Sequence, residues 1–208
     1  MLDVCEIFTS IQGEGPLMGR PAVFLRLAGC VPPFCEACDT PQALVPGRPM
    51  SVEAIVDALG DAPPLVVITG GEPFCQWETG LATLVSRLDA SGRDIQFETS
   101  GKAGIPAQAL GLVVCSPKPM DCPTLDTAAS SRADVFKFVI AEGDTGEETL
   151  ARIPALNLPA EKVWLMPEGQ TRAQQLRCMP RVWEMCVKSG YRFSPRLHIL
   201  TFDDKKGV

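Results

Sequence analysis

The chain has 208 residues, of which 46% are hydrophobic and 21% charged, as expected of a globular protein that can bury a core. Its net charge of −6 provides no basic surface for nucleic acid, and no apolar run approaches the roughly 20 residues of a membrane-spanning helix. The N-terminus lacks a signal-peptide pattern, so we expect a cytoplasmic protein whose nine cysteines stay reduced.

Six apolar runs rich in β-branched and aromatic residues predict strands. Several are almost continuous in Val, Ile, Leu and Phe, which is typical of parallel strands buried on both faces. The runs lie at residues 22–29, 64–70, 94–100, 112–118, 134–140 and 162–168.

Three stretches between or after these runs predict helices. Residues 50–60 begin at Ser51, a favoured N-cap, and end at Gly60, a favoured C-cap. Residues 77–92 carry leucine and valine at the spacing of one helical face. Residues 171–190 contain Pro180, which we expect to kink or split that helix.

Strands alternating with helices predict a single α/β domain over residues 1–208, in the form of an incomplete (β/α)6 TIM-like barrel. An open doubly wound sheet is the structural alternative. In either architecture, functional residues collect in the loops at the carboxyl ends of parallel strands. Four polar motifs fall at such positions, namely residues 29–40, 69–73, 98–101 and 116–118.

Cys30, Cys35 and Cys38 form a C-x4-C-x2-C pattern in the first of these loops. A structural zinc site needs four ligands, and His198 is the only histidine, so a Cys2His2 site is excluded while a Cys3His site remains open. Three thiolates can also hold an iron–sulfur cube that keeps one iron free for another ligand. The pattern favours iron–sulfur over zinc. We expect the other six cysteines to be small buried core residues: Cys5, Cys75, Cys115, Cys122, Cys178 and Cys186.

The cysteine pattern followed by "TGGEP" at 69–73 resembles the radical S-adenosylmethionine (SAM) superfamily. The resemblance implies a [4Fe–4S] cluster on the three thiolates, with SAM on the fourth iron as the source of a 5′-deoxyadenosyl radical. The usual superfamily spacing is C-x3-C-x2-C, so this loop is one residue longer.

Further motifs narrow the resemblance to the 7-carboxy-7-deazaguanine synthase family. They are "EIFTSIQGEGPLMGRPAVFLRLAGC" (6–30), "CDT" (38–40), "ETSG" (98–101), "SPK" (116–118) and "SPRLHILTFDDKKGV" (194–208). The family implies a Mg²⁺-dependent carbon–nitrogen lyase that converts 6-carboxy-5,6,7,8-tetrahydropterin to 7-carboxy-7-deazaguanine, with loss of ammonia, in queuosine (7-deazapurine) biosynthesis. It also implies a homodimer and a flavodoxin or ferredoxin reductant.

The same resemblance assigns roles to individual residues. The substrate contacts are Gln12, Gly13, Glu14, Arg26 and Thr69, where Arg26 offers a planar fork to a carboxylate. His198 either lines the substrate pocket or is a satisfied core residue, Thr40 binds Mg²⁺, and Glu98 is structural or contacts a ribose. The SAM contacts are Ala37, Cys38, Asp39, Gly71, Glu72, Ser116, Pro117, Lys118, Met166, Pro167, Glu168 and Gly169.

Two other functions are compatible with parts of this pattern. One is another small radical SAM enzyme, such as an activase that makes a glycyl radical on a partner protein. "QGEG" followed by Arg26 suits a small carboxylated heterocycle better than a protein surface. The other is a non-catalytic zinc or iron–sulfur binding module, which would need neither "TGGEP" nor "SPK" near its metal.

Overall fold

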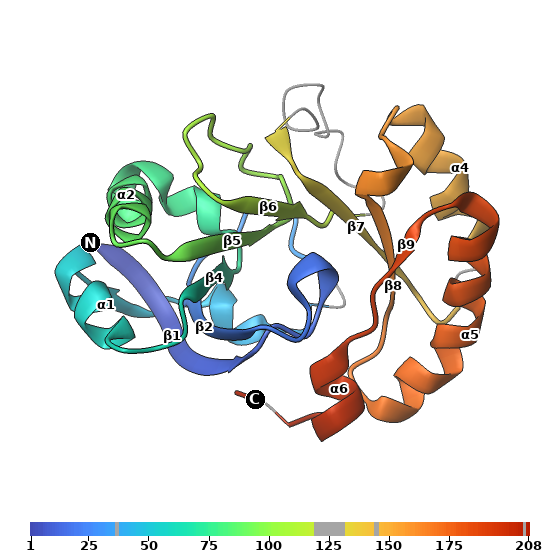
Figure 1. Cartoon of the computed structure of the whole chain (residues 1–208), viewed down its shortest axis with the longest axis horizontal. Coiled ribbons are helices and arrows are strands. Elements are labelled where there is room, and N and C mark those ends of the chain that lie inside the picture. The colour runs from blue at the N-terminus through green and yellow to red at the C-terminus, as the bar shows by residue number, and fades with distance from the viewer. Residues whose placement is uncertain (36–37, 119–131, 144–145, 206) are drawn as a thin grey trace.

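A mixed sheet forms the centre of the computed structural model, which describes the chain except residues 36–37, 119–131, 144–145 and 206 (Figure 1). Its nine strands are β1 (Leu2–Ile11), β2 (Pro21–Leu27), β3 (Arg48–Met50), β4 (Leu65–Gly70), β5 (Asp94–Thr99), β6 (Leu112–Cys115), β7 (Val135–Ile140), β8 (Val163–Pro167) and β9 (Arg192–Phe193). They are ordered β3-β1-β2-β4-β5-β6-β7-β8-β9. Neighbours from β2 to β9 are parallel, whereas β1 is antiparallel to both β2 and β3.

All six predicted strands are confirmed, as β2 and β4 to β8. The sequence did not predict β1, in which Leu2 and Val4 are buried but the later positions are only partly covered. It also missed β3 and β9, which are edge strands of three and two residues. Such short strands carry no period that a sequence pattern could reveal.

Five α-helices are described: α1 (Val52–Leu59), α2 (Ala82–Ala90), α4 (Glu147–Ala155), α5 (Arg172–Ser189) and α6 (Leu197–Phe202). The predicted cap of α1 is confirmed, because Oγ of Ser51 accepts from the N–H of Ala54 and Gly60 ends the helix. The predicted helix at 77–92 is present as a π-helical turn, Trp77–Leu81, that runs into α2. The sequence did not predict α4 or α6.

Of the kink or split expected at Pro180, the split is wrong, since α5 is continuous from Arg172 to Ser189. Proline removes one hydrogen bond, which would have joined its N–H to the carbonyl of Leu176. Leu176 is 56% exposed and Pro180 is also exposed. Water can therefore satisfy the freed carbonyl group, and a capping box at Thr171 and Gln174 stabilises the start of the helix.

The two faces of the sheet differ in chemistry. Leu25, Ile68, Phe97 and Phe136 pack with residues of α1, α2, α4 and α5 into one hydrophobic core. Strand side chains alternate between faces, so Arg26, Thr69, Glu98 and Lys137 lie on the opposite face. The four packed helices thus cover one face only, which does not fit the doubly wound alternative.

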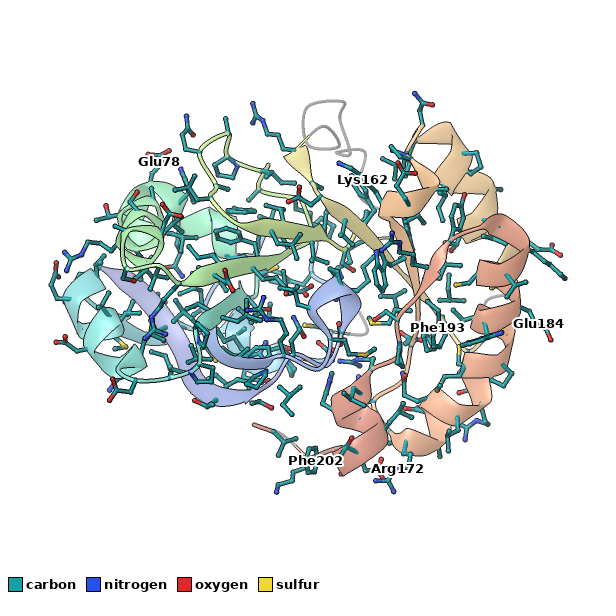
Figure 2. All side chains as sticks on the ribbon, viewed as in Figure 1. Glu78, Lys162, Arg172, Glu184, Phe193 and Phe202 are labelled. Carbon is teal, nitrogen blue, oxygen red and sulfur yellow. The ribbon has the colours of Figure 1, made fainter. Side chains whose placement is uncertain are left out.

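The helices leave their charged side chains outside. Figure 1 shows α1 and α2 at one end of the sheet, α4 and α5 at the other, and α6 beside the C-terminus. Glu78, Arg172 and Glu184 point away from the sheet at the periphery (Figure 2). No helix in the described part of the chain is long and apolar enough to cross a membrane.

Candidate active site

A buried group of charged side chains lies on the polar face of the sheet. Lys137, in β7, places its Nζ 2.6 Å from Oε2 of Glu14 and 2.9 Å from Oε2 of Glu98. The Lys137 side chain is only 5% exposed, so the two carboxylates replace the water that would otherwise solvate its ammonium group. Three segments distant in the chain thereby meet at one point.

Burial and charge oppose each other in this group. Burial alone would raise the pKa of Glu14, but the charges of Lys137 and Arg196 outweigh it and hold that pKa well below its usual range. Burial would lower the pKa of Lys137, and the two carboxylates reverse the shift. At Glu98 burial dominates and raises the pKa despite Lys137. Lys137 and Glu14 are therefore charged at neutral pH, while Glu98 protonates more readily than Glu14.

The predicted substrate residues Gln12, Gly13 and Glu14 lie in the loop between β1 and β2. Gln12 is buried, and its Nε2 donates to Oε1 of Glu98 at 3.4 Å while its Oε1 accepts from the N–H of Glu14 at 3.2 Å. A Cβ on Gly13 would come within 2.4 Å of Nδ1 of His198. Glycine at this position therefore lets the imidazole lie directly against the loop.

His198 borders the charged group from the first turn of α6. The preceding residue, Leu197, donates its N–H to the carbonyl of Gly13 at 2.9 Å. The His198 side chain is 27% exposed, and its Nε2 is 4.0 Å from Oε1 of Glu14. Burial lowers the pKa of His198, which favours the neutral imidazole at pH 7. The structure thus places His198 beside the predicted substrate residues and not within the hydrophobic core.

Arg26 and Thr69 are adjacent on β2 and β4 and share the polar face. Nε of Arg26 donates to Oε1 of Glu6 on β1 at 2.6 Å, and the guanidinium lies 6.0 Å from the centre of the Phe8 ring. A charge inside an apolar strand needs a partner. Glu6 is that partner for Arg26.

The three cysteines of the C-x4-C-x2-C pattern lie in the loop after β2. All three thiols are unpaired and partly exposed, and the N–H of Cys38 donates to the carbonyl of Cys35 at 3.3 Å. Burial raises the pKa of the Cys30 thiol. Within the described residues, no three His, Cys, Asp or Glu side chains are gathered into a group that could hold a metal ion. Ala37, predicted to contact SAM, lies outside the described residues.

The expectation of six buried cysteines outside this loop is partly wrong. Cys115, Cys178 and Cys186 are buried, but Cys75 is exposed and Cys5 is partly exposed. Cys75 lies on the outer side of a 3-10 turn, Pro73–Gln76, in which Phe74 takes the inward position. Cys5 lies where the pairing of β1 with β2 shifts register. Cys122 lies outside the described part of the chain.

The glycines of "TGGEP" are required by contacts within the protein. A Cβ on Gly70 would lie 2.2 Å from the carbonyl oxygen of Leu27, and one on Gly71 would lie 2.0 Å from that of Gly29. The end of β4 therefore packs against the start of the cysteine loop. The N–H of Glu72 also donates to the carbonyl of Gly29 at 2.8 Å.

Glu72 joins two of the loops at this edge. It is fully buried, and its carboxylate accepts from Oγ1 of Thr99 at 2.6 Å and from the N–H and Oγ of Ser100 at 2.9 and 2.5 Å. These protein donors occupy both of its oxygens. The arrangement makes Glu72 a tie between "TGGEP" and "ETSG".

The remaining predicted SAM residues follow β6 and β8 at the same edge of the sheet. The N–H of Ser116 donates to the carbonyl of Thr99 at 2.7 Å, and the N–H of Glu168 donates to that of Ile140 at 2.8 Å. Gly169 takes a φ of +145°, and its carbonyl accepts from Nη1 of Arg196 at 3.0 Å. The loops after β2, β4, β5 and β6 thus lie at one edge of the sheet, as the sequence predicted, and the loop after β8 lies at the same edge.

Comparison with known proteins identifies the family. No protein-family model matches the chain. It is 39% identical to the 7-carboxy-7-deazaguanine synthase of Pyrobaculum aerophilum, over 98% of this chain and 96% of that protein. It is 37% identical to the 7-carboxy-7-deazaguanine synthase of Hyperthermus butylicus, over 96% of this chain and 92% of that protein. The chain belongs to the 7-carboxy-7-deazaguanine synthase family.

The fold agrees with this assignment. The crystal structure of QueE from Escherichia coli matches with a TM-score of 0.75 at 26% sequence identity, over 95% of this chain and 94% of that one. The resemblance predicted from the motifs is confirmed, and so is the prediction of an enzyme of the synthase family. The α/β class is confirmed as well, with a sheet that is mixed because β1 runs antiparallel to its neighbours.

Two cations that pair with Glu14 were missed from the sequence. Lys137 interrupts the apolar run "DVFKFVI", which is the same signal that singled out Arg26. Arg196 carries no comparable local signal, because its importance arises only from the contacts of its side chain with distant loops.

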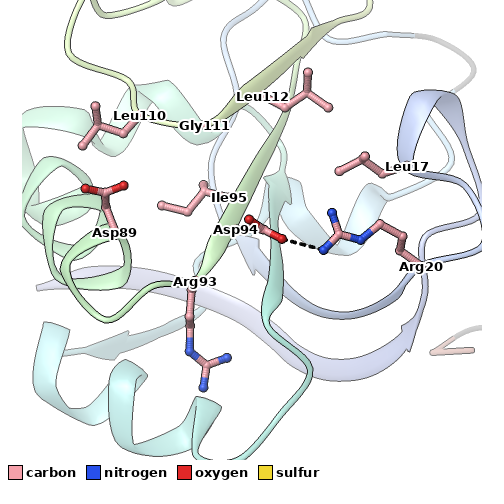
Figure 3. Close-up of a pocket in the computed structure, with 9 residues that line it drawn as sticks. All are labelled: Leu17, Arg20, Asp89, Arg93, Asp94, Ile95, Leu110, Gly111 and Leu112. Atoms are coloured by element: carbon pink, nitrogen blue, oxygen red, sulfur yellow. Dashed lines mark hydrogen bonds and ion pairs between the residues drawn. The ribbon is translucent and has the colours of Figure 1, made fainter.

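A hollow of about 350 Å³ has a lining that includes none of the residues of the charged group (Figure 3). It is lined by residues around the amino ends of β5 and β6, with an exposed ion pair between Arg20 and Asp94. None of the predicted site residues lines it, so it is separate from the synthase site.

Proposed function

We propose that this family member is a radical SAM enzyme converting 6-carboxy-5,6,7,8-tetrahydropterin to 7-carboxy-7-deazaguanine, with loss of ammonia, in queuosine or 7-deazapurine biosynthesis. The observation that carries the proposal is the buried group of Glu14, Glu98 and Lys137 on the polar face, beside the cysteine loop. A flat heterocycle with donors on one edge and a carboxylate needs anions and cations at fixed positions, and this group supplies both.

Cys30, Cys35 and Cys38 would hold a [4Fe–4S] cluster. Their thiols are unpaired, lie on one loop and are soft ligands suited to iron. SAM would lie against the loops after β2, β4, β6 and β8, near Asp39, Gly71, Ser116–Lys118 and Met166–Gly169. When bound, the cluster and SAM supply the radical that begins the reaction. The incomplete (β/α)6 barrel is the form of the fold that we propose around them.

The chain's own residues would bind and orient the pterin. Gln12 and the ionised Glu14 face the donors of its edge, and Arg26 offers its free nitrogens to the carboxylate. Burial raises the pKa of Glu98, so this carboxyl group takes up a proton more readily than Glu14 does. Thr69 and His198 would complete the walls of this site.

Thr40 would contribute one oxygen to Mg²⁺. Its Oγ1 donates to Oδ1 of Asp39 at 3.0 Å, so a hydroxyl and a carboxylate already lie together in the cysteine loop. Mg²⁺ takes few protein ligands and keeps water or substrate oxygens. The carboxylate of the substrate is the oxygen donor that fits this role.

A second copy of the chain and a flavodoxin or ferredoxin are the proposed protein partners. On α5, Leu176, Trp183 and Val187 are 56%, 60% and 72% exposed, at positions separated by seven and four residues along one helical stripe. Arg177 and Glu184 flank this stripe with opposite charges. An antiparallel second copy would bring each arginine toward the other chain's glutamate.

The decisive test is anaerobic reconstitution with iron and sulfide, followed by assay with SAM, Mg²⁺, dithionite and 6-carboxytetrahydropterin. We expect 7-carboxy-7-deazaguanine from the wild type and from the control Cys5→Ala, and none from Cys35→Ala. Formation of 5′-deoxyadenosine without that product would reject the substrate and leave the activase alternative. Zinc bound in place of iron, with no SAM cleavage, would favour the binding module.

A further inference from the structure

Arg196, directly before α6, contacts three separate loops through three nitrogens. Its Nε donates to Oε1 of Glu14 at 2.9 Å, its Nη1 to the carbonyl of Gly169 at 3.0 Å, and its Nη2 to Oδ2 of Asp39 at 2.5 Å. The side chain is 12% exposed. The backbone N–H of Arg196 donates to Oε1 of Gln175 on α5 at 3.3 Å, which fixes the base of the side chain.

The three loops belong to different parts of the proposed site. Glu14 lies in the loop that would bind the pterin, Asp39 follows Cys38 in the loop that would hold the cluster, and Gly169 lies in a loop proposed to contact SAM. A planar guanidinium holds its nitrogens at fixed angles. Because each nitrogen has its own acceptor, the guanidinium sets the spacing of all three loops.

Electrostatics gives the same contacts a second role. Glu14 and Asp39 are both carboxylates, and each has an oxygen within hydrogen-bond distance of the same guanidinium. Arg196 lies between them and pairs with both. Removing its charge would leave two buried or partly buried carboxylates that repel each other, so the two loops would move apart.

We propose that Arg196 is a positioning residue that locks the cysteine loop to the pterin loop and so couples the cleavage of SAM to the conversion of substrate. The roles given to the two loops, binding the pterin and holding the cluster, rest on the proposed function. The connection between the loops rests only on the contacts of Arg196. Lysine at this position would keep the charge but could not serve three acceptors in three directions.

Two measurements on anaerobically reconstituted enzyme test the lock, with Arg196→Lys as the variant. Arg87→Lys is the matched control, since it replaces an arginine that is paired with Glu53 but 54% exposed on α2. The first measurement is hydrogen exchange, followed by mass spectrometry, of peptides covering residues 38–45 and 9–20. The second is the ratio of product to 5′-deoxyadenosine.

For Arg196→Lys we expect about tenfold faster exchange in both peptides, and a fall of tenfold or more in product per 5′-deoxyadenosine. Arg87→Lys should match the wild type in both. Unchanged exchange and an unchanged ratio in Arg196→Lys would overturn the lock. Faster exchange spread evenly over the whole chain would also overturn it, because the residue would then serve global stability alone. If the wild type formed no product, the proposed function would fail, and the exchange data would still decide the role of Arg196.

Discussion

At the scale of single residues, Lys137 connects the charged group, although it was not among the residues chosen from the sequence. Its ammonium group joins Glu14 and Glu98, which are 123 and 39 residues away in the chain. One lysine in a short apolar run indicates that its charge needs a partner, but the sequence alone does not identify the partner residue. The partner is fixed only by the register of the sheet and by the loop between β1 and β2.

Replacing Lys137 with methionine should therefore lower the stability of the fold strongly. It leaves two buried carboxylates without their cation, and we expect a loss of about 3–5 kcal/mol in the free energy of unfolding. Urea unfolding at pH 7 measures the loss. Lys188→Met, at an exposed position on α5, is the control and should stay within about 0.5 kcal/mol of the wild type. A Lys137→Met protein as stable as the control would show that the ion pairs contribute nothing.

The lowered pKa of Glu14 gives a prediction for pH. A carboxyl group whose pKa is lower in the folded state stabilises the fold above its unfolded pKa, about 4.3 for glutamate. That contribution is lost as the pH falls through the lower folded value. The difference in unfolding free energy between wild type and Glu14→Gln should be constant from about pH 5 to 7 and shrink below about pH 4.

Urea titrations between pH 3 and 7 would test this dependence. Glu78→Gln, which alters an exposed carboxylate in the turn before α2, serves as the control and should show no such change. A difference that stays constant down to pH 3 would mean that Glu14 gains no charge stabilisation from Lys137 and Arg196.

At the scale of elements, the sequence predicted the strands and helices that have a regular apolar pattern or clear caps, and it missed those that have neither. The six strands and the capped helix α1 follow from apolar runs and from Ser51 and Gly60, and all are present. The loops at the carboxyl edge could be predicted as well, since parallel strands share an edge. β1 and α6 could not, because β1 is only partly buried and α6 has six residues with one buried side chain, Ile199. Those two elements bring Glu14 and Arg196 to the site.

Pro180 provides a test at this scale. It lies at an exposed position inside α5, a continuous helix, and costs that helix one hydrogen bond. Pro180→Ala should raise the free energy of unfolding by about 1–3 kcal/mol. Urea unfolding at the same protein concentration as the wild type measures the gain. A loss of stability would indicate instead that the proline ring itself packs against something.

At the scale of the whole molecule, the helices cover one face of the sheet and leave the other to the charged group. The hydrophobic core therefore lies on one face of the sheet, and the charged residues of the candidate site lie on the other. The exposed stripe of Leu176, Trp183 and Val187 lies on the outer side of α5, away from both. A partner bound there would leave the site open to its substrate.

If a second copy binds this stripe, a charge introduced into it should separate the two chains. Trp183→Glu is expected to convert a dimer to a monomer in sedimentation-velocity experiments at micromolar concentration, because it buries an unpaired charge in the interface. Phe202→Glu, at a side chain 48% exposed on α6, is a control that should leave the dimer intact. A wild-type chain that sediments as a monomer at all concentrations would reject the stripe as an interface.

The contacts of Glu72 bear on what happens to the folded protein when its cluster is lost. Glu72 forms hydrogen bonds with Thr99 and Ser100, and all of these partners are protein atoms. Gly70 and Gly71 likewise pack closely against protein backbone, at Leu27 and Gly29. These contacts at the rim of the site therefore do not depend on a bound metal. We therefore expect that oxygen damage to the cluster inactivates the enzyme without unfolding it. Iron and sulfide could then rebuild the cluster in the same molecule, without degradation and new synthesis.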